Sequence, residues 1–272
     1  MSKPRLTYFD FAGSRGEECR IALHLAGVDF DDARVKNAAW PALKANMPFG
    51  AMPVLEMPGK PPLAHSNAIL VYIGRQHGLH PADDFEAARH EALMCAVEEL
   101  RHAITPTLRI ADPEHKRAAR EALAANELAT WGSQVERQLG DGPFVAGQSL
   151  QVSDIKLYMV VRWLTSGTLD HVPATVLDHC PKLLRLYRAV GEHPAPVVGL
   201  PAFVDVVEAQ LGVLLQCVDR VQIEAHQLVR DVRQWDCGHA ARGGERGSSA
   251  HGGNALRILV HVLAVEQVES AL

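Results

Sequence analysis

The chain has 272 residues, of which 47% are apolar and 22% charged, a composition that is typical of globular proteins and excludes a wholly disordered chain. Its 27 basic and 32 acidic side chains leave a net charge of −5 without a long run of one sign, which argues against a nucleic-acid-binding surface. No apolar stretch reaches the roughly 18 residues that cross a bilayer, and the first residues lack the apolar core of a signal peptide. We therefore expect a cytoplasmic protein with no membrane or nucleic-acid partner.

The first eighty residues predict alternating strands and helices. Apolar and β-branched residues favour strands over residues 5–11, 30–35, 53–57 and 62–64. Apolar positions at helical spacing favour helices from Arg15 to Gly27, from Trp40 to Ala45 and from Ser66 to Gly78. The order βαβαββα, with a parallel pair followed by a hairpin, predicts a small mixed sheet covered by helices.

The segment from residue 80 to 203 is expected to be all-helical. A polar linker over residues 80–84 precedes long amphipathic runs over residues 85–110 and 114–139, and shorter ones over 153–164 and 181–191. We therefore predict an N-terminal α/β domain over residues 1–79 and a helical-bundle domain over residues 80–203.

Residues 204–272 differ in composition from the rest of the chain. No lysine follows Lys182, and six of the sixteen residues from 238 to 253 are glycine, a composition typical of a flexible linker. The apolar runs on either side are compatible with helices. Two interpretations stay open for this atypical, partly helical or disordered extension: a genuine third segment, or a read-through or frame-shifted end.

Cysteine and histidine spacing gives no metal motif. The five cysteines are widely spaced without a CxxC pair, which indicates reduced thiols rather than a disulfide framework. His77 and His80 are three residues apart, but no third ligand stands beside them and no HExxH appears. We expect no metal site.

Several short motifs occur in an order and spacing that point to one family. They are a strand over residues 6–10, the segment 13–20 (Gly-Ser-Arg-Gly-Glu-Glu-Cys-Arg), Trp40-Pro41, residues 48–53 (PFGAMP) and residues 66–69 (SNAI). Over roughly residues 3–200 the chain resembles the glutathione S-transferases, most closely their tyrosine-based, sigma-like branch. The resemblance implies a thioredoxin-like N-terminal domain, a helical C-terminal domain, a homodimer, and glutathione as a co-substrate with no further cofactor.

The family chemistry assigns a role to Tyr8 at the end of the first strand. The nucleophile is a thiolate, and a free thiol has a pKa near 8.5. A phenol that donates to the sulfur would stabilise the anion, helped by the N-terminus of the following helix and by Arg15. Without the resemblance, a core tyrosine that packs on a neighbouring helix is the better interpretation of Tyr8. Ser14 is the competing thiol activator, although a plain helix N-cap is the interpretation we favour for it.

The resemblance also implies which residues bind glutathione. The backbone of Met52, before a cis Pro53, would contact the cysteinyl part. Trp40 and Lys44, four residues apart on a short helix, would hold the glycyl end, although an exposed lysine is an equally good interpretation of Lys44.

At the head of the next helix, His65 and Ser66 would bind the γ-glutamyl carboxylate, unless Ser66 is only a cap. The family usually has glutamine in place of His65, and histidine lacks the donor-plus-acceptor pairing of an amide. A second departure is Gln151, a poor N-cap three residues before Asp154, which we assign a structural role.

The electrophile site and the overall activity are less closely specified. Phe11, Ile104 and Leu108 are candidate apolar walls, with a core role as the alternative. Glu98 and Glu99 lie near the place where the family reaches across the dimer to the γ-glutamyl amine, but we interpret them as solvated. We expect a detoxifying glutathione transferase that acts on small apolar electrophiles. The alternatives are a glutathione-dependent isomerase or peroxidase, and a non-catalytic binding or structural protein, for which the change at His65 is the best argument.

Overall fold

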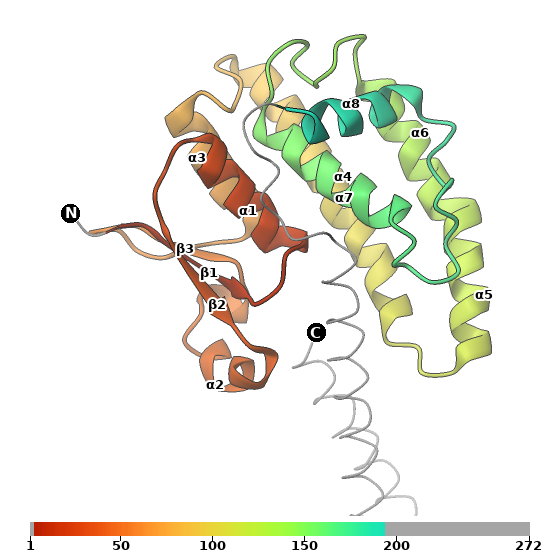
Figure 1. Cartoon of the computed structure of the whole chain (residues 1–272), viewed down its shortest axis with the longest axis horizontal. Helices are drawn as coiled ribbons and strands as arrows, with labels where there is room; N and C mark the ends of the chain where they lie inside the picture. Colours follow the sequence, from red (N-terminus) through yellow and green to blue (C-terminus); the bar gives the residue numbers. More distant parts are fainter. Residues whose placement is uncertain (1–2, 194–272) are drawn as a thin grey trace, which may run out of the picture. The chain divides into compact units, whose positions relative to one another are not determined.

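A small sheet and a bundle of helices make up residues 3–193, the part of the chain that our computed structural model describes (Figure 1). These residues belong to one compact unit. The expectations for residues 204–272, including the glycine-rich linker and the flanking helices, lie outside the described residues.

The N-terminal sheet is mixed, as the sequence predicts. Its strands are β1 (Arg5–Phe9), β2 (Asp31–Val35), β3 (Val54–Glu56) and β4 (Leu63–Ala64), in the order β2-β1-β3-β4. β1 is parallel to β2 and antiparallel to β3, and β3 is antiparallel to β4. β1 ends two residues earlier than expected, because the N–H of Phe11 turns back to the carbonyl oxygen of Phe9 at 2.9 Å.

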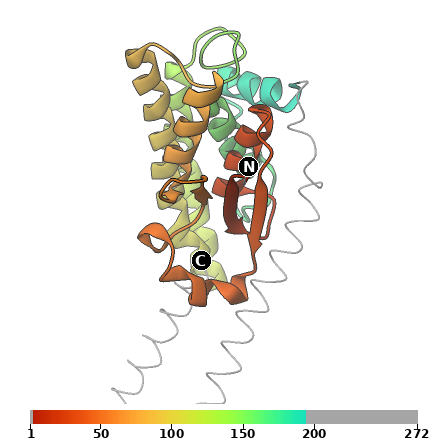
Figure 2. The same ribbon diagram turned by 90° about the vertical axis from the view of Figure 1, so that its left-hand side faces the viewer.

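Three helices accompany the sheet: α1 (Ser14–Leu25), α2 (Trp40–Lys44) and α3 (Ser66–His77). The apolar side chains of α1 and α3 share a core with Leu6 of β1 and Leu55 of β3, all fully buried or nearly so. α3 ends at Gly78 in the left-handed conformation with φ 71°, which glycine adopts at little cost. α1 lies between the sheet and the helical bundle (Figures 1 and 2).

The bundle contains α4 (Asp84–Leu108), α5 (Pro113–Leu123), α6 (Ala129–Gln138), α7 (Val152–Thr165) and α8 (Pro181–Gly191). Asp83 and Asp112 cap α4 and α5, since each carboxylate accepts backbone N–H groups of the first turn. The sequence predicts one helix over residues 114–139. The structure inserts a π-helical turn, Ala124–Leu128, between α5 and α6.

α7 is the central helix, with nearly every side chain from Val152 to Val161 buried, and it packs against α1, α3, α4 and α8. Asp154 holds its N-terminus by accepting the N–H groups of Gln151 at 2.7 Å and Val145 at 2.8 Å. The structural role expected for Asp154 is confirmed. Gln151 adds no side-chain cap, since its Oε1 is buried without a partner.

Within residues 3–193, none of the helices is both long enough and apolar enough to cross a bilayer. The same residues contain no group of three or more His, Cys, Asp or Glu side chains placed to hold a metal ion.

Candidate active site

The phenol of Tyr8 lies at the C-terminal end of β1, buried against the first turn of α1. The turn approaches so closely because residue 16 is glycine: a Cβ on Gly16 would come within 2.0 Å of Tyr8 Cδ1. The ring of Phe11 covers the tyrosine from another side, with centroids 5.5 Å apart. Backbone and side-chain packing therefore hold the phenol at the head of a helix.

The surroundings of Tyr8 keep its hydroxyl protonated. Burial raises the pKa of the phenol, and Glu18 acts in the same direction. A side-chain hydrogen bond with Ser14 and the charges of Arg15 and Arg101 oppose this rise without cancelling it. Since the phenol stays neutral at physiological pH, it can donate a hydrogen bond to an anion.

The N-cap interpretation of Ser14 is wrong. Gly13 is the N-cap of α1, and Ser14 is the first helical residue, with φ 54°. Its hydroxyl hydrogen-bonds Tyr8 instead of a backbone N–H. Tyr8 and Ser14, the two candidate thiol activators, thus lie side by side, and the Ser14 hydroxyl is a hydrogen-bond partner of the phenol.

Arg15 is anchored by Glu98 of α4. Its Nε and Nη2 atoms lie 2.8 and 2.7 Å from Glu98 Oε2. The interpretation of Glu98 as a solvated residue is therefore wrong, whereas Glu99 is exposed as expected. Burial raises the pKa of Glu98, but the charges of Lys156, Arg101 and Arg15 outweigh this and lower it to about 2.

A buried charge cluster lies directly behind this pair, and sequence reasoning missed it. Glu18 of α1 binds Arg101 of α4 and, at 3.0 Å, Lys156 of α7. All three side chains are 5% exposed or less. The detectable sign was a charged residue in an otherwise apolar helical run, such as Lys156 after Ile155 and before Leu157, since an unpaired charge is almost never buried.

The bond between Met52 and Pro53 is cis, as the resemblance implied. β3 begins at the next residue, and Thr7 of β1 pairs with Val54. The antiparallel register therefore brings Met52 alongside the C-terminal end of β1, next to the strand position of Tyr8.

The head of α3 completes this edge, because β4 pairs with β3 through Ala64 and Val54 and α3 follows at Ser66. His65 is the N-cap of α3, with φ 67° and no side-chain cap bond. Its exposed ring packs on the ring of Phe49, with centroids 5.0 Å apart. The interpretation of Ser66 as a cap is wrong, because it is the first helical residue and its buried Oγ accepts a hydrogen bond from Lys156.

The remaining candidates differ in accessibility. Trp40 is buried edge-on against Phe9, with centroids 5.5 Å apart, while Lys44 is exposed. Phe11 is half-buried, Leu108 is 37% exposed, and Ile104 is fully buried in the core. The core alternative therefore fits Ile104 better than a pocket wall, and Phe11 and Leu108 stay candidates.

Two family models match the chain. Residues 4–75 match the N-terminal domain of glutathione S-transferases, and residues 98–195 match the C-terminal domain. The protein belongs to the glutathione S-transferase family. This confirms the assignment that the motifs predicted, with its thioredoxin-like domain followed by a helical domain.

The relatives of this transferase-family chain include glutathione S-transferases, prostaglandin D synthases and S-crystallins. A 110-residue match is 41% identical to glutathione S-transferase 1 of Ascaris suum, covering 40% of the chain and 52% of that protein. The chain thus spans about half the length of that relative. Hematopoietic prostaglandin D synthase of Gallus gallus is 30% identical over 72% of the chain and 94% of its own length.

The similar solved structures also include both prostaglandin synthases and glutathione S-transferases. A prostaglandin synthase D of Nilaparvata lugens is 26% identical over 71% of the chain and 94% of its own, with a TM-score of 0.63. The glutathione S-transferase of Ascaris lumbricoides is 28% identical over 71% of the chain and 93% of its own, with a TM-score of 0.58.

Proposed function

We propose that the protein is a glutathione transferase that conjugates the glutathione thiolate to small apolar electrophiles. The observation that carries the proposal is the protonated phenol of Tyr8, buried at the head of α1 beside Ser14 and Arg15. A neutral donor at a helix N-terminus, flanked by a guanidinium, suits a thiolate. Lowering a thiol pKa by about 1.5 units needs about 2 kcal/mol, within reach of one charge-assisted hydrogen bond.

Glutathione would lie along the edge formed by the ends of β1 and β3 and the head of α3. In this proposal the backbone of Met52 binds the cysteinyl part, and Ser66, with the N–H groups of α3 and the ring of His65, binds the γ-glutamyl carboxylate. Lys44 pairs with the glycyl carboxylate next to Trp40. Glutathione is the co-substrate, and the proposal needs no further cofactor.

The electrophile would approach the sulfur from the side of α4. In this proposal Phe11, which is half-buried, and Leu108, which is exposed, are apolar walls of its binding site. We place the protein in the cytoplasm and assign it a detoxifying role, with neither nucleic acid nor membrane as a partner.

Replacing Tyr8 by phenylalanine tests the proposal. The variant should conjugate about 10- to 100-fold more slowly, equivalent to about 1.4–2.7 kcal/mol, while it still binds glutathione. Binding is measured by calorimetry, and the rate with a chromogenic aryl halide. Tyr187→Phe is the matched control, since Tyr187 lies on α8 and its ring stacks on Tyr158, away from the candidate site. Full activity of Tyr8→Phe together with an inactive Ser14→Ala would transfer the role to the serine.

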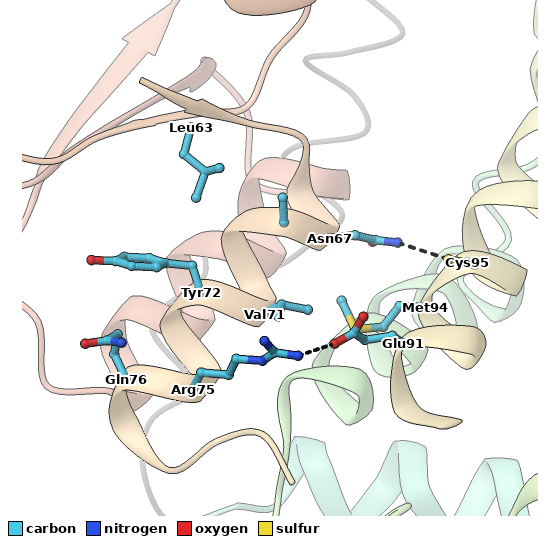
Figure 3. Close-up of a pocket in the computed structure, with 10 residues that line it drawn as sticks. Leu63, Asn67, Val71, Tyr72, Arg75, Gln76, Glu91, Met94 and Cys95 are labelled. Atoms are coloured by element: carbon cyan, nitrogen blue, oxygen red, sulfur yellow. Dashed lines mark hydrogen bonds and ion pairs between the residues drawn. The ribbon is translucent and has the colours of Figure 1, made fainter. Parts of the chain in front are cut away.

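We also propose that two copies of the chain form a homodimer through α3 and α4. A groove of about 460 Å³ runs between these helices (Figure 3). Its apolar floor includes Val71, Tyr72 and Met94, and an ion pair between Arg75 and Glu91 at 3.1 Å lies at one end. Apolar area of this kind on a surface is typical of an interface.

A second candidate function is a glutathione-dependent isomerisation. The observation that favours it is the near full-length match to prostaglandin D synthase of Gallus gallus, which covers 94% of that relative. An aryl halide and a cyclic endoperoxide, each supplied with glutathione, separate the two candidates. Conjugate formation supports the transferase, whereas turnover of the endoperoxide without consumption of glutathione supports the isomerase.

A further inference from the structure

The side chain of Lys156 is completely buried where four helices meet. Its Nζ lies 3.0 Å from Glu18 Oε2 on α1, 2.5 Å from Glu98 Oε1 on α4 and 3.0 Å from Ser66 Oγ on α3. An ammonium group has three N–H donors and no acceptor. Three acceptors therefore fix the orientation of the group completely.

The positive and negative charges of the cluster around Lys156 are unequal in number. Three cations, Arg15, Arg101 and Lys156, share two carboxylates, Glu18 and Glu98. The cluster thus holds a surplus of one positive charge. Arg15 and Glu98 are partly exposed, but Glu18, Arg101 and Lys156 are buried, where charges are screened much less than in water. The neutral partner of Lys156 is the hydroxyl of Ser66, at the head of α3.

The contact with Lys156 decides what the hydroxyl of Ser66 can do. Because Oγ accepts a hydrogen bond from the ammonium, its own proton must point elsewhere. A hydroxyl that accepts from a charged donor is polarised and becomes a stronger donor itself. The oxygen accepts from Lys156, and the proton is left free to donate to an acceptor at the head of α3.

We propose that Lys156 is a positioning residue for the γ-glutamyl carboxylate of glutathione. Through Ser66 it orients a polarised O–H donor toward the head of α3 and adds the surplus positive charge behind it. The inference rests on the proposed function, since it takes that carboxylate as the anion bound there. It predicts an effect on the affinity for glutathione and none on the chemistry at Tyr8.

Lys156→Met is the direct test, and both carboxylates retain partners in this variant. Glu18 still binds Arg101, and Glu98 still binds Arg15 and Arg101. Calorimetry should give a Kd for glutathione about tenfold higher than in the wild type. The Kd of an analogue that lacks the γ-glutamyl α-carboxylate should not change, nor should kcat at saturating glutathione.

Two further variants separate positioning from a purely structural role. If Lys156 acts through the serine, the double variant Ser66→Ala/Lys156→Met should bind glutathione no more weakly than Ser66→Ala alone. Lys116→Met is the matched control, because this lysine pairs with Asp170 at 3.8 Å, away from α3. The control should bind both ligands like the wild type.

The outcomes distinguish this inference from the proposed function. If the wild type does not bind glutathione, the proposed function fails. If the wild type and Lys156→Met bind glutathione equally well, only the role of Lys156 fails. The role of Lys156 also fails if the Lys156→Met substitution weakens the binding of glutathione and of the analogue by the same factor.

If Lys156→Met does not fold, the inference is tested in the wild type by nitrogen-15 NMR of the lysine ammonium groups. The slowly exchanging, buried ammonium should shift on addition of glutathione and not of the analogue. Absence of that difference overturns the inference.

Discussion

The serines at the heads of α1 and α3 show how a single residue type serves two purposes. Both are first helical residues at which the sequence favours a cap, and both instead contact a side chain that faces the candidate site. Ser14 hydrogen-bonds Tyr8, and Ser66 accepts from Lys156. Capping preference is a local property, whereas these contacts depend on how the helices pack on β1 and on α7, and Lys156 of α7 lies 90 residues from Ser66.

His65 is the residue whose identity departs most clearly from the family pattern, and its replacement by glutamine gives a sharp prediction. An amide presents N–H donors and an oxygen acceptor side by side on one carbon, whereas neutral imidazole has one donor and one acceptor on separate ring nitrogens that point in different directions. His65→Gln should tighten glutathione binding at pH 8 by up to about 1 kcal/mol, or about fivefold. Calorimetric titration measures the change, with the exposed His77→Gln on the same helix as control. Equal affinities would mean that His65 does not contact the ligand.

At the scale of elements, the packing of α1 on β1 depends on Gly16. A methyl group at this position would overlap the ring of Tyr8, with Cδ1 at 2.0 Å. Gly16→Ala should therefore lower the free energy of unfolding by about 1–3 kcal/mol and reduce conjugation about 10- to 100-fold through displacement of the phenol. Thermal unfolding and kcat/KM measure the two effects.

The matched control for this prediction is Gly140→Ala, since a Cβ there would meet no atom within 4 Å. In the background of Tyr8→Phe, Gly16→Ala should add little further loss of activity. A large additional loss would show that α1 serves the site by a route other than the tyrosine.

The contact between α4 and α7 contains a histidine that is buried in its neutral form. His90 Nδ1 lies 2.8 Å from Ser153 Oγ, and burial, assisted by the charge of His80, lowers the pKa of His90 to about 4. Because the folded-state pKa lies below the unfolded value near 6.5, the contribution of His90 to stability is complete above pH 6.5. It is lost as the pH falls toward 4.

From pH 7.5 to 5, His90 alone should lower the free energy of unfolding by about 2 kcal/mol. His90→Asn keeps a polar atom near Ser153 and should remove this dependence, whatever its effect on stability at pH 7.5. Urea unfolding at both pH values gives the difference, and His102→Asn, an exposed position of α4, should behave like the wild type. An unchanged pH dependence in His90→Asn would show that the pKa of His90 is the same in the folded protein and in the unfolded chain.

Sequence patterns predict the helices and strands but not the charge cluster, because a pattern describes one segment at a time. Periodicity reports which face of a segment is apolar, and it located β1, α1, α3 and the bundle helices within a few residues. It does not report which partner a buried charge meets. Glu18, Arg101 and Lys156 come from three helices, so their pairing is visible only in the assembled structure. For Ile104 the sequence leaves a pocket wall and a core position open, because burial by a distant segment leaves no local pattern, and the structure buries it in the core.

At the scale of the whole molecule, the matched family domains end before the change in composition. The C-terminal domain model ends at residue 195, and the described residues through α8 form one compact unit. The core of the bundle is already complete there, since α7 is buried by α1, α3, α4 and α8. Among the described residues, those of the candidate site and of the groove between α3 and α4 all belong to the chain up to α7.

A chain that ends at residue 203 should therefore fold, dimerise and bind glutathione like the full chain. Light scattering after size exclusion measures the mass, and calorimetry gives the Kd for glutathione. Val71→Arg supplies the control for dimerisation, because a charged side chain in the groove between α3 and α4 should yield a monomer in both chain lengths. A shortened chain that is insoluble would make residues 204–272 part of the folding unit. A soluble monomer would instead assign them to the interface, and the groove would then lose its proposed role.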